Sequence, residues 1–423
     1  MGYTLSEKIL ARAAGLDHVN AGDIIWVNID RAMMDDVLGP KLEIDDCLKK
    51  LGVPVWDPDK VVLISDHYTP PANNMQANFV KFTRDWAKEY GVRNYYEFAG
   101  PCHQVMVENG HVLPGHVAVG TDSHTCTYGA LAAFSTGVGS TEMAGVLATG
   151  QTWMRVPATI LAEWNGTLPA GVMAKDISLR TIKEVGHSGA TYKTLEYAGS
   201  TIANMIMDER FCLTNMAVEA GAKAGLIGYD DETARYMAQF GVTERFDDLR
   251  SDDDAVFEKK LAFDSSTLVP QVACPHEVDN VCAAAEVGEV RIDQAYIGSC
   301  TGGRYSDLKA AADLLKGKHI APDRRLLVSP ASRDIYNRCL KDGTLGVLAD
   351  AGATILASCC GACLGVHSGN IADGEVCVST TNRNFLGRMG SKLSKVYLAS
   401  PLTAAASAVA GRIIDPREMM EGA

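Results

Sequence analysis

The sequence predicts an α/β protein that is built on parallel β-sheets and divided into several domains. Short apolar runs bounded by small residues recur along the chain, which is typical of buried parallel strands. In the last third, such runs alternate with helical patterns, as they do in strand–helix–strand units. The chain has 423 residues, of which 47% are hydrophobic. That length exceeds what one core holds, so we expect two to three domains.

An amphipathic helix is expected near the start of the chain. Thr4 and Glu7 have the spacing of a capping box, in which each side chain satisfies a free backbone N–H of the first turn. A strand should follow at residues 23–27. The adjacent carboxylates Asp35 and Asp36 lie just before a Gly-Pro step, and we interpret this pair as a solvated turn.

Two further strands, at residues 61–64 and 117–119, run directly into polar side chains. In open α/β sheets the loops that leave the carboxyl ends of strands line the ligand crevice. An Asp beside a His can tune that imidazole as an acid or base, although a single such pair is often incidental. The candidate site residues in this part of the chain are Asp66, His67, His103, Asp122, Ser123 and His124.

Two other kinds of site fit this region poorly. A Ser-His-Asp hydrolase would need a G-x-S-x-G elbow around Ser123, and adjacent residues cannot easily face one another as a triad. The glycines at 137 and 139 miss the dinucleotide-binding fingerprint, because Glu142 stands where the third glycine belongs. We expect these glycines to pack closely against a helix at residues 141–151.

The middle of the chain reads as a second mixed unit, with a strand at residues 156–161. Glu196 lies between Leu195 and Tyr197, so its carboxylate should be partly buried and in need of partners. Acidic runs between residues 229 and 260 indicate solvated surface, which we take as the approach to a linker that ends near residue 275. The expected domains are residues 1–153, 154–275 and 276–423.

Three cysteines follow apolar runs in the last third of the chain. Cys300 comes after residues 295–297, and the pair Cys360 and Cys363 comes after residues 353–356. Structural zinc and iron–sulfur clusters usually take four protein ligands, so three thiolates suggest a cluster with one iron left open. Two alternatives stay open: Cys300 could be a core residue, or a fourth ligand could complete a zinc or electron-transfer site.

Arginines that could bind a carboxylate follow the strand expected at residues 376–379. The guanidinium group forms paired hydrogen bonds with carboxylates, so Arg383 and Arg388 beside the cysteines favour a carboxylate clamp. Each arginine on its own would be read as a surface residue.

Composition narrows the class of protein. The formal net charge of −13 argues against a nucleic-acid partner, whose backbone demands basic patches. No apolar run approaches the ~18 residues of a membrane span, and the first residues have no signal-peptide core. Twelve cysteines without an export signal indicate a reducing compartment, so we expect a cytoplasmic protein.

Taken together, these motifs resemble the aconitase superfamily nearly from end to end. Within it, the chain is most similar to the stand-alone large subunits of the 3-isopropylmalate dehydratase and homoaconitase type. The motifs that carry the resemblance are Gly298-Ser299-Cys300-Thr301, Cys360-Gly361-Ala362-Cys363, Thr121-Asp122-Ser123-His124-Thr125, Asn382-Arg383-Asn384-Phe385-Leu386-Gly387-Arg388 and Ser400-Pro401-Leu402-Thr403-Ala404-Ala405.

The resemblance implies three α/β/α domains around a central [4Fe–4S] cluster, whose open iron acts as a Lewis acid on a substrate hydroxyl. His67, steered by Asp66, would protonate the departing hydroxyl. The other roles follow the family motifs. The substrate hydroxyl would be hydrogen-bonded by His103, Asp122 and His124, with Glu196 nearby. Substrate would be bound by Ser123, Asn382, Arg383 and Arg388. The cluster would be held by Cys300, Cys360 and Cys363.

The resemblance also implies a partner. Relatives carry the catalytic base, a serine, on a swivelling fourth domain, and we expect a separate small subunit to supply it here. The implied activity is a hydro-lyase acting on a hydroxy di- or tricarboxylic acid, most similar to 3-isopropylmalate dehydratase of leucine biosynthesis. Sister substrates are 2,3-dimethylmalate, citramalate-type acids and homoaconitate, and an RNA-binding relative is a further alternative. Gly302 and the pair Asp35-Asp36 depart from the family pattern, which keeps these sister substrates as alternatives.

Overall fold

The first parallel sheet lies in the N-terminal third of the computed structural model, which describes residues 2–420. Its strand β3 reads Val-Val-Leu-Ile-Ser and is buried throughout, as expected for a strand covered on both faces. All neighbouring strands are parallel. In spatial order they are β4 (Asn94–Glu97), β3 (Val61–Ser65), β2 (Arg31–Asp35), β5 (Val117–Gly120) and β6 (Phe134–Gly137).

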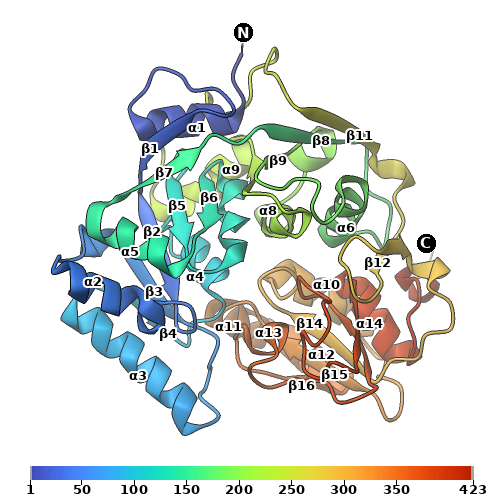
Figure 1. Ribbon diagram of the computed structural model, residues 1–423. Helices are drawn as coiled ribbons and strands as arrows, with labels where there is room; N and C mark the ends of the chain where they lie inside the picture. The colour runs from blue at the N-terminus through green and yellow to red at the C-terminus, as the bar shows by residue number, and fades with distance from the viewer. Residues whose placement is uncertain (1, 421–423) are drawn as a thin grey trace.

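Helices cover this sheet and a short ribbon borders it (Figure 1). The capping box of Thr4 and Glu7 is confirmed at the start of α1. The strand expected at residues 23–27 is β1 (Ile24–Asn28), which pairs antiparallel with β7 (Gln151–Arg155) rather than joining the parallel sheet. The helices are α1 (Leu5–Ala14), α2 (Asp45–Leu51), α3 (Asn74–Glu89), α4 (Cys102–Glu108) and α5 (Ser140–Thr149).

The second sheet is also parallel and corrects the expected linker. Its order is β10 (Ala224–Ile227), β9 (Thr194–Ala198), β8 (Thr159–Asn165) and β11 (Lys259–Asp264). Strand β11 lies inside the stretch that the acidic runs had marked as an approach to a linker, because Leu261 and its neighbours pair with β8. The helices of this unit are α6 (Ala174–Val185), α7 (Ser200–Ala203), α8 (Met207–Met216) and α9 (Asp231–Met237).

The third sheet holds the C-terminal strand–helix units that the sequence predicts. Its order is β13 (Val281–Ala283), β12 (Gln271–Ala273), β18 (Lys395–Ala399), β17 (Val376–Ser379), β14 (Gln294–Gly298), β15 (Arg325–Ser329) and β16 (Ala353–Ile355). Only the contacts of β12 are antiparallel. The helices are α10 (Tyr305–Leu315), α11 (Arg333–Lys341), α12 (Thr344–Asp350), α13 (Gly361–Leu364) and α14 (Pro401–Ala410).

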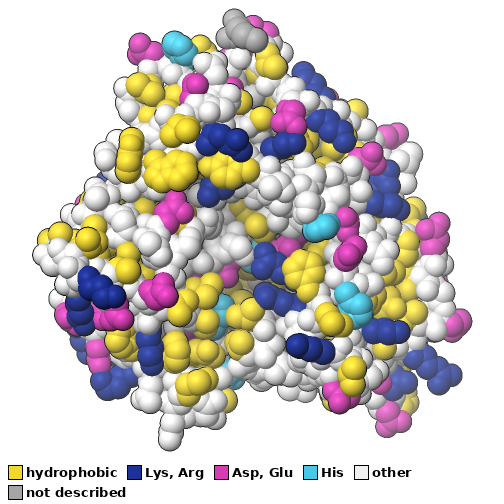
Figure 2. All heavy atoms as spheres, viewed as in Figure 1, with side chains coloured by type: hydrophobic (Ala, Val, Ile, Leu, Met, Phe, Trp, Pro, Cys, Tyr) yellow, Lys and Arg dark blue, Asp and Glu magenta, His cyan; other side chains and the backbone are white. Residues whose placement is uncertain are grey.

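The division into three domains at residues 153 and 275 stays a prediction. The first of these positions falls inside β7, and β12 already belongs to the third sheet although it precedes residue 275. The three larger sheets surround a common centre, and α8 and α13 lie between them (Figure 1). On the same face the surface is hollowed at this centre, where basic, acidic and histidine side chains gather (Figure 2).

The first and second units touch through the 3-10 helix η3 (Ser123–Leu131), which packs on α8 and β10. The contact is close because Gly129 has no side chain: a Cβ there would collide with the carbonyl oxygen of Gly225. Since η3 begins at Ser123, this packing fixes one edge of the centre. No helix among residues 2–420 combines the length and the apolar character needed to cross a membrane.

Candidate active site

His67 lies in the loop after β3 and is surrounded by carboxylates. Its Nδ1 is 2.8 Å from Asp66 Oδ1, 3.3 Å from Asp36 Oδ1 and 3.9 Å from Asp35 Oδ1. Burial opposes the charged imidazole, but the nearby carboxylates, Asp66 first among them, raise the pKa of His67 well above its usual value. His67 is therefore an imidazolium at neutral pH, which suits a proton donor.

Asp35 and Asp36 are buried, so the interpretation of this pair as a solvated turn is wrong. Asp36 accepts hydrogen bonds from the backbone N–H groups of residues 66, 67 and 68, at 3.1–3.4 Å. Asp35 accepts from the N–H groups of Val37 and Leu38 and from Thr121 Oγ1 at 2.7 Å. Backbone donors at the ends of adjacent strands thus replace the water that a surface turn would offer.

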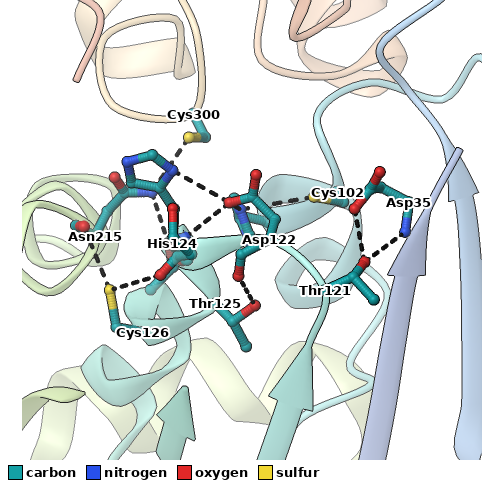
Figure 3. Close-up of polar contacts among 12 residues, drawn as sticks. Asp35, Cys102, Thr121, Asp122, His124, Thr125, Cys126, Asn215 and Cys300 are labelled. Carbon is teal, nitrogen blue, oxygen red and sulfur yellow. Dashed lines mark hydrogen bonds and ion pairs between the residues drawn. The ribbon is translucent and has the colours of Figure 1, made fainter. Parts of the chain in front are cut away.

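A second polar cluster gathers around Asp122, which follows β5 (Figure 3). Asp122 Oδ1 lies 2.8 Å from His103 Nε2, and it accepts a hydrogen bond from the backbone N–H of His124 at 2.7 Å. Burial alone would raise the pKa of Asp122, but its hydrogen bonds with His103 and His124 hold that pKa well below the usual value. Asp122 is therefore ionised and orients both histidines.

The carboxylate that completes this cluster is Glu219, not Glu196. His124 Nε2 is 2.7 Å from Glu219 Oε1. Glu196 lies on β9, where its carboxylate accepts a hydrogen bond from Ser251 Oγ at 2.8 Å and where burial raises its pKa to about 7. The role expected of Glu196 near the reacting hydroxyl stays a prediction, which its contact with Ser251 does not support. No local signal distinguishes Glu219, because its partners come from distant segments.

Arg383 joins the cluster from the loop after β17. Its Nε lies 2.9 Å from Glu219 Oε1, and Nη2 donates to Ser123 Oγ at 3.0 Å. Arg388 stands apart from this network: its Nε is buried and has no hydrogen-bond partner among the described residues. Its charge nevertheless lowers the pKa of Cys363, which places it beside the cysteines.

The three predicted cysteines meet at the same centre from two loops of the third sheet. Ser299 takes the left-handed conformation with φ 69°, which turns the chain sharply before Cys300. The backbone N–H of Cys360 donates to the Asp66 carbonyl at 3.0 Å, so the cysteine loop contacts the loop of His67. The backbone N–H of Cys363 donates to the Cys360 carbonyl at 2.9 Å, which holds these two cysteines in one tight turn.

Hydrogen bonding and burial separate the three thiols in their acidity. The neighbouring Cys360 thiol lowers the pKa of Cys363 well below its usual value. Burial raises the pKa of Cys300 to about 12, and Asn215 Nδ2 donates to its sulfur at 3.2 Å.

Two amides link the cysteines to the polar clusters. Asn382 donates through Nδ2 to Asn215 Oδ1, and its own Oδ1 lies 3.7 Å from Cys363 Sγ. Asn215 is in turn the donor to Cys300 (Figure 3). The donor set of three buried or half-buried thiols with an amide N–H on sulfur fits an iron–sulfur cluster, whose ligands are thiolates tuned by hydrogen bonds.

Comparison with known proteins agrees with this geometry. The family model described as Aconitase family (aconitate hydratase) matches residues 7–411. The chain is 51% identical over 419 residues to the 3-isopropylmalate dehydratase large subunit 1 of Methanopyrus kandleri, covering 99% of each chain. It is 45% identical over 423 residues to the 3-isopropylmalate dehydratase large subunit of Halothermothrix orenii, covering 99% of this chain and 100% of that one.

The fold has a counterpart among solved structures. The crystal structure of the holo-form of Thermococcus kodakaraensis aconitase X matches with a TM-score of 0.50 and 12% identity, covering 90% of this chain and 89% of that one. This likeness concerns the fold alone. The family model and the full-length relatives carry the conclusion that the chain belongs to the aconitase family.

Proposed function

We propose that this chain is the large subunit of a 3-isopropylmalate dehydratase, a hydro-lyase of leucine biosynthesis. One observation carries the proposal: an unbroken set of contacts joins Cys300 through Asn215 and Asn382 to Cys363, while Arg383, Glu219 and the histidines meet at the same centre. Relatives with this name match the chain over its whole length. A soft-metal site beside a carboxylate-binding arginine and paired acid–base groups suits the dehydration of a hydroxy acid.

We assign the cluster ligands to Cys300, Cys360 and Cys363, and the cluster type to [4Fe–4S]. When bound, such a cluster supplies Lewis-acid polarisation of the substrate hydroxyl. Asn215 donates to the sulfur of Cys300, and this hydrogen bond stabilises its thiolate form.

His67 has the role of general acid in this proposal. Its raised pKa keeps a proton on the ring at neutral pH, and Asp66 at 2.8 Å fixes the ring through Nδ1. The proton on Nε2 is then the one available to the departing hydroxyl. Asp122, ionised and bonded to His103 and His124, orients the groups that hydrogen-bond that hydroxyl.

Substrate carboxylate binding falls to Arg383 and Arg388 in this proposal, with Ser123 and Asn382 beside them. Glu219 holds Arg383 through Nε, and Ser123 accepts from Nη2, which fixes the plane of the guanidinium group. A fixed guanidinium loses less conformational entropy when it binds a carboxylate.

A separate small subunit completes the site in this proposal. The relatives are named as large subunits, which supports a two-chain enzyme. By the family resemblance, that partner carries the serine that removes the proton next to the carboxylate. The chain by itself should then bind a cluster but turn over little substrate.

The second candidate function is the dehydration of one of the sister substrates, and Asp35 supports it. This buried carboxylate stands where the family usually has His or Gln, and it is held by Thr121 near His67. Gly302, the other departure, has a packing reason instead: a Cβ there would collide with Thr380, whose hydroxyl bonds the backbone of Gly298.

Anaerobic reconstitution with the candidate small subunit tests the proposal. Unsaturated product is followed by absorbance with 3-isopropylmalate, 2,3-dimethylmalate, citramalate and homoaconitate, and the large subunit alone serves as the control. We expect turnover of 3-isopropylmalate only when both chains are present. Inactivity toward every acid, with the cluster intact, contradicts the assignment.

A further inference from the structure

Lys175 is a buried lysine without an acidic partner in the described part of the chain, and burial lowers the pKa of its ammonium group. Its side chain lies on α6, the residue is 1% exposed, and Nζ donates to the backbone carbonyls of Thr380 at 3.1 Å and Thr381 at 2.7 Å. None of the ion pairs among the described residues involves it. Burying an ammonium group is costly unless a negative charge lies close by. The position of Lys175 therefore calls for a counter-charge.

Four groups with negative forms lie within electrostatic reach of Lys175, and two of them are unsuitable as counter-charges. They are Cys212, Cys363, Cys300 and Glu219. Cys212 is not among the proposed cluster ligands, so no metal removes its proton, and burial raises the pKa of its thiol to about 11. Glu219 already pairs with Arg383 and His124. The sulfurs of Cys300 and Cys363 remain, because cysteines that hold a metal cluster are deprotonated.

Arg304, at the start of α10, is a second buried basic residue without an acidic partner among residues 2–420. It is fully buried at the start of α10, four residues after Cys300, and its Nε donates to Gln104 Oε1 at 3.1 Å. Its Nη1 and Nη2 have no hydrogen-bond partner among the described residues, and no ion pair there includes it. It follows directly on the turn that holds Cys300, in which the backbone N–H of Gly303 donates to the Ser299 carbonyl at 3.1 Å. Two buried cations from separate helices thus flank the cysteines.

We propose that Lys175, together with Arg304, supplies the positive charge that balances the thiolates of the cysteine site and raises the reduction potential of the cluster held there. The inference rests on the proposed function, because it takes the cluster as given. Positive charge near an iron–sulfur cluster favours the reduced form, since reduction adds an electron. Lys175 also positions Asn382, because it holds the two carbonyls just before that residue.

Substitutions at Lys175 separate charge from positioning. K175Q removes the charge but retains an N–H donor for the carbonyls, K175M removes both, and K175R retains both. K183Q is the matched control, because Lys183 is exposed on the same helix. Each large subunit is loaded anaerobically with iron and sulfide, its iron content is measured, and the midpoint potential is determined by redox titration monitored by electron paramagnetic resonance.

We expect more negative midpoint potentials in K175Q and K175M, with K175R and K183Q unchanged from the parent protein. Loss of cluster binding in both neutral variants, with K175R loading normally and far-ultraviolet circular dichroism unchanged, also supports the proposal. An unchanged potential in fully loaded K175Q overturns it, since only positioning would then remain.

If neither neutral variant folds, R304Q decides by the same titration, and an unchanged potential in it overturns the proposal. The readout requires neither substrate nor small subunit. A normal shift of potential in a protein that dehydrates none of the acids would therefore refute the proposed function while upholding this inference.

Discussion

At the scale of single residues, the acid–base chemistry that we propose depends on carboxylates that the fold buries. Asp66 and His67 could be predicted from the sequence, because they follow an apolar strand directly. Asp35 and Asp36 could not, since Asp36 receives backbone N–H groups from the next strand end and Asp35 receives the hydroxyl of Thr121, 86 residues away. Glu219 was missed for the same reason: His124 and Arg383 reach it from positions 95 and 164 residues away.

His67 should give the enzyme a basic limb in its pH–rate profile. Its raised pKa means that kcat falls as pH rises through that value, because the proton donor is lost. H67Q should lower kcat by about 10²–10⁴-fold. D36N removes one neighbouring carboxylate and lowers the pKa of His67, so the limb should move to lower pH. D46N, at an exposed carboxylate, is the control, and a limb that stays in place in D36N would count against His67 as the acid.

Glu219 and Glu196 offer a matched pair of substitutions. E219Q weakens the hold on Arg383 and His124, and a lost charged hydrogen bond of about 1.5–3 kcal/mol should lower kcat/KM by about 10–100-fold. E196Q should leave kcat/KM unchanged, because Glu196 contacts Ser251 instead. The opposite ranking in steady-state kinetics would restore Glu196 to the site.

Glu196 should instead affect stability. Its folded pKa of about 7 lies above the unfolded value, so the folded state binds the proton more tightly and loses stability as pH rises from about 4.3 to 7. E196Q removes this loss of stability. The free energy of unfolding of E196Q minus that of the parent should therefore be larger at pH 8 than at pH 5. Denaturant unfolding at both pH values measures it, and an equal difference at the two would contradict the assigned pKa.

At the scale of elements, the α/β rhythm of the last third could be predicted well, because buried parallel strands and capped helices each leave a local pattern. The helical patterns that alternate with apolar runs in this part of the sequence correspond to α10, α11 and α14. The acidic runs at residues 229–260 led to the wrong prediction of a linker, because β11 is an edge strand whose pairing with β8 depends on distant residues.

The contact of η3 with β10 should be intolerant of added volume. G129A places a Cβ against the Gly225 carbonyl, and overpacking of this kind costs about 1–3 kcal/mol. Because η3 carries His124, kcat should fall as well. G145A on α5 meets open space and should be neutral or slightly stabilising. Thermal unfolding of both variants measures the difference, and equal melting temperatures would show that the close contact does not contribute to stability.

At the scale of the whole molecule, the site exists only where three sheets meet. Cys300, Cys360 and Cys363 come from the third sheet, His67 and Asp122 from the first, and Asn215 and Glu219 from the second unit. The sequence predicts the strand ends one by one, but it does not show that they lie together. Only the resemblance to the aconitase family predicts that they meet at one centre. Loosening any one unit should therefore impair cluster binding and acid–base chemistry together.

Controlled oxidation of the loaded large subunit tests most directly whether three thiolates leave one iron open. Iron content and electron paramagnetic resonance are followed as air is admitted. We predict the loss of one iron per cluster with the appearance of a three-iron signal, reversed by ferrous iron and thiol. Release of all the iron at once, or retention of all of it through a fourth protein ligand, would contradict the account.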